Sequence, residues 1–164
     1  MSDIVQLKEN GVLKYLKTHV KAVEGLDEYI SAQQKGDTVV LYDGLTNAKG
    51  IYFDDSQSYA IDSKKTLLSL VMVWSGYEIG GAPKSYGGRT MVYEGTSVRK
   101  MQASGISMRE LFQYGVASDY ICCKDIVFSS AGITGTANNA TTPTNGKDNR
   151  NIVLRYAAVT YAKE

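Results

Sequence analysis

From residue 38 onwards, apolar residues fall in short runs separated by turn-forming residues. The runs lie at 38–44, 50–53, 59–61, 66–74, 89–95, 97–104, 118–130 and 151–161. We expect 89–95 and 97–104 to form a strand pair, whereas 107–115 fits either a short helix or a strand. Strands at roughly 8 to 12 residue spacing, with turns between them, are typical of sandwiches and jelly rolls. The pattern therefore predicts a mainly β chain with an antiparallel β-sandwich or jelly-roll-like head.

Two of these runs are apolar on both faces of the predicted strand. The segment 66–74 reads TLLSLVMVW, and 151–161 reads NIVLRYAAVTY. Strict alternation in the second run puts Ile152, Leu154, Tyr156 and Ala158 on one face and Val153, Arg155, Ala157 and Val159 on the other. Strands without a polar face are typical of the middle of a sheet. We therefore expect the 151–161 strand to close the core.

The first 36 residues have a different pattern. Short apolar segments at 3–7 and 12–17 flank Asn10-Gly11, a strong hairpin signal because both residues tolerate positive φ. Apolar residues then recur at three- and four-residue spacing, at Val20, Val23, Leu26 and Ile30, which predicts a short helix ending near Gly36. So short a helix is marginal alone and needs a packing partner. The stripe must pack either on the domain that follows or on copies of itself, and the change of pattern places a boundary between residues 1–36 and residues 37–164.

The charge balance excludes several classes of function. The chain has 18 Lys plus Arg against 17 Asp plus Glu, a net charge of +1. Nucleic-acid binders and polybasic membrane anchors usually carry a basic excess. No apolar run approaches the ~20 residues that span a bilayer, and the N-terminal stretch is polar, which predicts synthesis in a cytosol without a secretory signal.

Candidate catalytic and metal-binding chemistry is sparse. His19 is the only histidine, and Cys122 and Cys123 are neighbours that point to opposite faces of a strand. No nucleophile-elbow, zinc-protease or phosphate-loop motif occurs. A pair of carboxylates for glycan hydrolysis would have to come from Asp54, Asp55, Glu78, Glu94, Asp119 and Asp125. We expect no enzyme, no metal site and no cofactor.

One segment suits ligand binding. Tyr77 and Tyr86 lie in the glycine-rich stretch 75–88, and Arg89 follows directly. Aromatic rings near an arginine suit a sugar face or a polyol phosphate, and the alternative is tyrosines that cover the end of a sheet. Trp74 is expected in the core. The long polar stretch from about 130 to 150 is either a surface segment that contacts a partner or a flexible tip.

Both ends of the chain resemble a known group of proteins. The opening IVQLKENGVLKYLKTHVKAVEGLDE, the motifs VVLYDG and GIYF, and the end KDIVFSSAGITGTANNAT leading to NRNIVLRYAAVTY resemble tail-fibre and baseplate proteins. These are receptor-binding or minor structural tail proteins of phages and prophages of Gram-positive bacteria. Proteins of this group often have an extended shaft, whereas here the predicted helix leads almost directly into the head.

The resemblance implies a homotrimeric virion protein of the tail tip or baseplate. It also implies that residues 1–36 are an N-terminal anchor with a short oligomerisation helix and that residues 37–164 are the β-sandwich head domain. Its head would bind a host cell-wall saccharide or teichoic acid, and its other partners would be tail and baseplate proteins. On this basis Tyr77, Tyr86 and Arg89 are candidate ligand-binding residues, and Val23, Leu26 and Ile30 are candidate oligomerisation residues. Two alternatives remain: a structural or adaptor subunit that binds no receptor, and a cell-wall glycan depolymerase.

Overall fold

The computed structural model describes residues 7–9, 12–14, 36–113, 121–142 and 148–163. The chain divides into two compact units, Met1–Gly36 and Asp37–Ala162. In the first, β1 (Leu7–Glu9) pairs antiparallel with β2 (Val12–Lys14), as the Asn10-Gly11 signal predicts. The predicted helix with Val23, Leu26 and Ile30 lies outside the described residues, as does His19.

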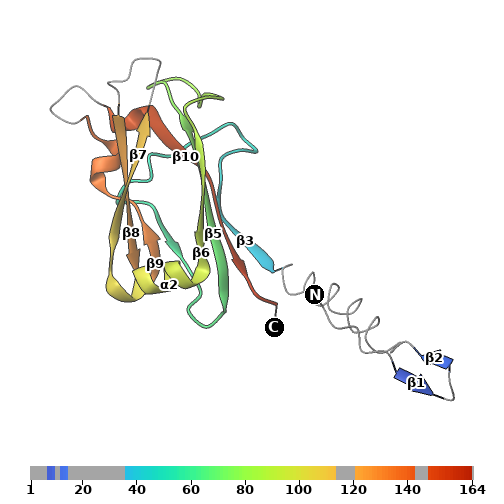
Figure 1. Ribbon diagram of the computed structural model, residues 1–164. Helices are drawn as coiled ribbons and strands as arrows, with labels where there is room; N and C mark the ends of the chain where they lie inside the picture. The colour runs from blue at the N-terminus through green and yellow to red at the C-terminus, as the bar shows by residue number, and fades with distance from the viewer. Residues whose placement is uncertain (1–6, 10–11, 15–35, 114–120, 143–147, 164) are drawn as a thin grey trace. The chain divides into compact units, whose positions relative to one another are not determined.

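The head consists of two four-stranded antiparallel sheets that face each other, with α2 at one end (Figure 1). The first sheet has the order β3 (Asp37–Asp43), β10 (Ile152–Tyr161), β5 (Leu67–Gly76) and β6 (Arg89–Glu94). The second has the order β4 (Ser58–Ala60), β9 (Gly132–Thr134), β8 (Ile121–Ser129) and β7 (Ser107–Gln113). The mainly β, antiparallel prediction is therefore confirmed, and β10 lies in the middle of its sheet as expected.

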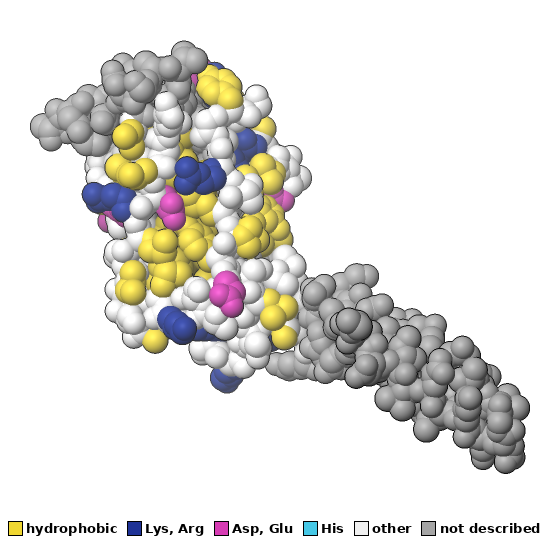
Figure 2. Space-filling view, in the orientation of Figure 1, with side chains coloured by type: hydrophobic (Ala, Val, Ile, Leu, Met, Phe, Trp, Pro, Cys, Tyr) yellow, Lys and Arg dark blue, Asp and Glu magenta, His cyan; other side chains and the backbone are white. Residues whose placement is uncertain are grey.

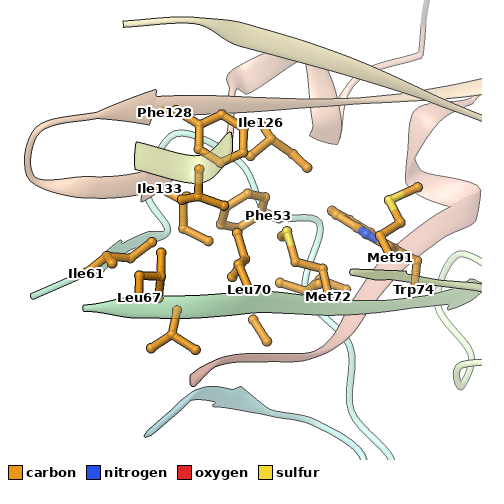
Figure 3. Packing of buried hydrophobic residues seen from close by; sticks show 14 of the residues in the cluster. Phe53, Ile61, Leu67, Leu70, Met72, Trp74, Met91, Ile126, Phe128 and Ile133 are labelled. Atoms are coloured by element: carbon orange, nitrogen blue, oxygen red, sulfur yellow. The ribbon is translucent and has the colours of Figure 1, made fainter. Parts of the chain in front are cut away.

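The core lies between the two sheets. Leu67, Leu70, Met72 and Trp74 line one face of β5 and point towards Ile126 and Phe128 of β8 (Figure 3). Trp74 is 1% exposed, which confirms its predicted place in the core. Its ring meets Phe53 and Phe112 at centroid distances of 6.1 and 5.6 Å. Burying each such side chain stabilises the fold by ~1.5–3 kcal/mol.

The segment 95–104 is a helix, so the prediction of a strand at 97–104 was wrong. α2 (Gly95–Ser104) buries Val98 and Gln102, and Met101 packs on the core. These three positions have the spacing of one helical face, a signal that the apolar count alone does not show. Gly105 ends the helix at a φ of 62°, a left-handed conformation that glycine adopts without strain. The segment 107–113, open between helix and strand, is β7.

A bulge at Arg155 changes the faces of β10. Leu154 is opposite Trp74, but Tyr156 is opposite Val73, so Arg155 is an extra residue in the ladder. Beyond the bulge, Ala157 and Val159 point into the core, and Tyr156 and Ala158 point away. The predicted face shared by Leu154, Tyr156 and Ala158 was therefore wrong, because strict alternation ignores a bulge.

The described part of the polar stretch is built into the head rather than forming a free tip. It contains β9 and two short 3-10 helices, η1 (Ala137–Ala140) and η2 (Asn149–Asn151). Asn139 and Asn149 are buried, at 0% and 1% exposed. Asn139 Nδ2 donates to the Phe53 carbonyl oxygen at 2.6 Å, which ties η1 to the chain before β4. Because the buried Asn139 side chain makes several hydrogen bonds, it holds this part of the polar stretch against the head.

These two asparagines continue the edge of β8 where β9 stops. β9 pairs with β8 only from Val127 to Ser129. Two residues further along the same edge, the Asp125 N–H donates to Asn139 Oδ1 at 2.7 Å, and Asn139 Nδ2 donates to the Asp125 carbonyl oxygen at 2.8 Å. Two residues beyond, the Cys123 N–H donates to Asn149 Oδ1 at 2.8 Å. Side-chain amides thus replace a missing strand and satisfy the exposed edge.

Candidate functional site

A depression of about 400 Å³ lies at the glycine-rich segment, on the outer face of the first sheet. We define the outer face as the side of that sheet turned away from the second sheet. The depression is lined by Leu45, Val73, Trp74, Ser75, Lys84, Ser85, Tyr86, Gly87, Gly88, Arg89, Thr90 and Arg155. Tyr86 and Arg89, two of the three predicted ligand-binding residues, are therefore brought together.

Glycine lets the segment 76–88 fold back over the end of β5. The Gly76 N–H donates to the Tyr86 carbonyl oxygen at 2.9 Å, and the Lys84 N–H donates to the Gly76 carbonyl oxygen at 2.7 Å. A Cβ at Gly88 would lie 2.4 Å from the Trp74 carbonyl oxygen, so only glycine allows this approach. The segment consequently presents Tyr86, which is 57% exposed, beside Arg89 at the start of β6.

Three cationic residues, Lys84, Arg89 and Arg155, are part of the lining, and none of the described lining residues is acidic. Arg155 lies at the bulge in β10, on the face opposite to the core residue Leu154, and its Nη2 donates to the Gly44 carbonyl oxygen at 3.3 Å. The Arg155 Nε is buried and has no hydrogen-bond partner among the described residues. Lys84 pairs with Glu78, whose pKa the lysine holds below its usual value. The lining suits an anionic or polyhydroxylated ligand.

Arg89 belongs to the lining of this depression and of a second one, and its side chain lies on the core-facing side of β6, as do Met91 and Tyr93. Its guanidinium lies 5.6 Å from the Phe112 ring centroid, and its Nη1 is 4.0 Å from Glu110 Oε2. The Arg89 side chain is 55% exposed, so solvent screens this ion pair and its contribution to stability is small. The second depression, of about 330 Å³, is lined by Arg89, Leu111, Phe112, Gln113 and Ile121. Figure 2 shows one side of the head, and hydrophobic side chains gather over the middle of that side.

Tyr77 lies apart from the other two predicted ligand-binding residues. It is absent from the lining of the depression and packs edge-on against Tyr52, with ring centroids 5.9 Å apart. Its N–H donates to the Asn151 carbonyl oxygen at 2.7 Å. Tyr77 therefore links the glycine-rich segment to η2 through its backbone, and these contacts give it a structural role.

Sequence reasoning missed Arg155, Lys84 and Leu45 as parts of the depression. One signal pointed to Arg155, since it is the only charged residue in the apolar run 151–161. A charge at such a position needs a solvent-facing site or a partner. Lys84 and Leu45 carried no comparable signal, because their proximity depends on how the two loops fold.

The candidate carboxylates have other roles where the structure describes them. Asp125 accepts two bonds from Arg109, at 2.7 and 3.0 Å, and these bonds hold the pKa of its carboxyl below the usual range. Asp54 accepts from Ser56 in a turn, and Glu94 accepts from Ser97 in the first turn of α2. Asp119 lies outside the described residues. In the parts of the head that the structure describes, these acids serve local geometry.

Lys124 is a buried lysine of the head, and the pKa of its amine is lowered. Lys124 is fully buried on the core face of β8, and its Nζ donates to the carbonyl oxygens of Asn139 at 2.8 Å and Tyr52 at 3.3 Å. Burial lowers the pKa of its amine to about 7. Cys122, on the same face, is buried and free, and burial raises the pKa of its thiol to about 11. Both side chains are enclosed by packing and lie outside the lining of the depression. They contact the polar stretch instead, Lys124 at Asn139 and Cys122 at Asp148.

Comparison with known proteins leaves the site to be judged on its own geometry. No protein-family model, curated protein or solved structure matches the chain. Among the described residues, no group of His, Cys, Asp and Glu is arranged to hold a metal ion. Within the same residues, no helix has the length and apolar character needed to cross a membrane.

Proposed function

We propose that this protein is a phage tail-tip or baseplate protein that attaches the virion to its host by binding cell-wall carbohydrate. The resemblance of both chain ends to such proteins motivates the proposal. The observation that supports it best is the depression with Tyr86, Arg89 and Arg155 and without an acid among its described lining residues. The ligand class is teichoic acid or an anionic polysaccharide.

The chemistry of the depression suits binding without bond cleavage. An arginine fork donates to phosphate or carboxylate oxygens, and the exposed Tyr86 ring offers an apolar face to a sugar or polyol. Glycan hydrolysis needs a proton donor and a base or nucleophile, usually two carboxylic acids. The described lining residues supply neither, so binding is the activity we propose.

Attachment would depend on several copies acting together. A shallow, open site gives a weak single interaction. Copies held in one homotrimer engage the same surface at high effective concentration, and avidity then exceeds the affinity of one site by orders of magnitude.

Binding to isolated cell walls tests the proposal. Fluorescently labelled full-length protein is incubated with Gram-positive cell walls before and after teichoic acid is stripped. We expect binding that is lost on stripping, and loss of wall polymer on incubation would point to a depolymerase instead. No binding to walls from a broad panel of strains would contradict the receptor role.

A second candidate, a structural subunit of the tail or baseplate, is favoured by a different observation. Val40 and Val92 on the outer face are 51% and 66% exposed, more than most valines in a folded domain. Such side chains suit a protein partner. In this role the isolated protein would ignore cell walls and bind other virion proteins.

A further inference from the structure

Three separate segments of the head meet at the Lys124 amine. Lys124 lies on the core face of β8 and is fully buried. Its Nζ donates to the carbonyl oxygen of Asn139 in η1 at 2.8 Å and to that of Tyr52, in the chain before β4, at 3.3 Å. Asn139 holds the same chain segment, because its Nδ2 donates to the Phe53 carbonyl oxygen at 2.6 Å. We call Lys124, η1, Tyr52 and Phe53 the lysine anchor.

The groups around the buried amine do not balance a positive charge. Among the described residues, no carboxylate is in ion-pair contact with it. Three titratable groups act on it electrostatically, namely the Cys122 thiol on the same face of β8, Asp148 before η2, and Asp54 in the chain before β4. Asp148 already pairs with Arg150 at 2.7 Å, and Tyr52 presents its ring, with the amine 5.7 Å from the centroid. The residues of η1 contribute no titratable side chain.

Burial without a paired carboxylate disfavours the ammonium form of a lysine. The pKa of the Lys124 amine is accordingly lowered to about 7, whereas a solvated lysine has a value near 10.4. A conformation in which the amine reaches water therefore binds a proton more tightly than the closed anchor does. By linkage, each unit by which the pH falls between about 10 and about 7 raises the ratio of open to closed anchor by up to about tenfold. Below about pH 7 the ratio levels off, because both forms are then protonated.

We propose that the lysine anchor is a proton-sensitive latch, in which uptake of a proton by Lys124 releases η1 and the segment of Tyr52 and Phe53 from β8. These elements suit local opening, since η1 is four residues long and the edge of β8 beside it is completed by side chains rather than by a strand. Their release breaks no bond between core strands, because the ladders of β8 with β7 and of β5 with β10 lie elsewhere.

The latch goes beyond the proposed function and stands independently of the proposed ligand, because none of its residues belongs to the lining of the depression. Its effect is on the polar stretch. The end of the head that carries η1 is closed at alkaline pH and has a larger open fraction near neutral pH, while the sandwich itself stays folded.

Hydrogen–deuterium exchange of the full-length protein at pH 8.5 and pH 7.0 tests the latch, with each rate corrected for intrinsic exchange at that pH. The reporters are the amides of Asn139 and Thr141, and that of Asp125, which the Asn139 side chain protects. We expect their protection to fall by about tenfold from pH 8.5 to pH 7.0. At both pH values they should exchange roughly tenfold or more faster than the Leu70 amide in β5, a strand paired on both sides.

Two variants separate the latch from other effects of pH. Lys124→Met removes the titrating amine, so protection of the reporter amides should be equal at the two pH values, whatever its level. Lys100→Met, at an exposed lysine of α2, is the matched control and should keep the wild-type change. A persisting change in Lys124→Met would overturn the latch.

The wild type alone provides further outcomes that decide. Reporter amides with the same protection at both pH values, or with the protection of Leu70, would show that the anchor opens only with the whole head and would overturn the proposal. Titration of the Lys124 side chain, followed by carbon-13 NMR of its Cε, should give a midpoint near 7. A midpoint near 10.4 would show a solvated amine and would also overturn it. Wall binding enters none of these measurements, so failure of the latch leaves the proposed function untouched.

Discussion

The side chain of Asn139 makes both strand-type hydrogen bonds of Asp125. Its Oδ1 accepts from the Asp125 N–H at 2.7 Å, and its Nδ2 donates to the Asp125 carbonyl oxygen at 2.8 Å. A primary amide has the same donor and acceptor spacing as a peptide group, so one asparagine can stand in for a strand residue. The asparagine-rich stretch after β9 is therefore part of the sheet edge.

Asn139→Asp should destabilise the head by about 3 kcal/mol. The carboxylate keeps the shape of the amide but cannot donate, so it leaves the buried carbonyl oxygens of Phe53 and Asp125 without a donor. Urea unfolding followed by tryptophan fluorescence measures the loss. The control is Asn47→Asp, an exposed residue whose Oδ1 accepts from Lys49, a bond that aspartate can also make. Equal midpoints for both variants would contradict the anchor role.

Lys124 should make the stability of the head depend on pH between about 7 and 9. Its folded pKa of about 7 lies well below the unfolded value near 10.4, so the unfolded chain binds more protons in this window. Stability from this group therefore rises with pH, by at most about 1.4 kcal/mol per pH unit. In Lys124→Met this slope should vanish.

The measurement for Lys124 is a set of urea midpoints at pH 6.5, 7.5 and 8.5 for both proteins. The difference between the two curves isolates the lysine from other groups that titrate nearby, Cys122 among them. Parallel curves would show that the amine is solvated in the folded state.

Gly135→Ala should cost about 3 kcal/mol or more. A Cβ at Gly135 would lie 1.6 Å from the Phe53 carbonyl oxygen, and this oxygen already accepts from Asn139, so the backbone must move. Gly105→Ala is the comparison, because a Cβ there meets no atom within 4 Å and only its left-handed φ of 62° adds strain, about 1 kcal/mol. Thermal melting of both variants checks the order, and a reversed order would refute it.

Much of the fold follows from apolar patterns, and the exceptions have local causes. The strands β5 and β10 are predicted correctly because a run that is apolar on both faces is typical of a strand in the middle of a sheet. The helix at 95–104 is missed because only two residues of its core-facing side, Val98 and Met101, are apolar in an otherwise polar segment. The faces of β10 are missed because one inserted residue, Arg155, reverses the alternation.

The candidate site was only partly predictable. Tyr86 and Arg89 are close in sequence, so a local turn suffices to bring them together. Arg155 comes from β10 and Leu45 from the loop after β3, and their position depends on the strand order, which apolar patterns do not encode. Tyr77 is also close in sequence to the first pair, but it packs against Tyr52 and is not part of the lining of the depression.

Arg89→Ala and Tyr86→Ala should each weaken binding to teichoic-acid-bearing walls by about tenfold, because each removes a direct contact group. Lys100→Ala, an exposed cation on α2, is the charge-matched control and should bind like the wild type. Tyr77→Phe should also bind normally, because Tyr77 lies outside the depression. Equal weakening in Lys100→Ala would mean that net charge, not the depression, controls attachment.

Ile30→Asp should weaken self-association, because a charge replaces an apolar residue of the predicted N-terminal stripe. Light scattering of the full-length chain at several concentrations gives the assembly mass. An unchanged mass in Ile30→Asp would remove the stripe from the interface.

The position of β10 in the sequence determines when the first sheet can be completed during synthesis. This strand follows every other strand of the head in the sequence, yet it pairs with β3 on one side and β5 on the other. Until a ribosome has made residues 152–161, β3 has no partner and β5 lacks one of its two neighbours. The nascent head must wait in an incomplete state, and long-range pairing of this kind slows folding.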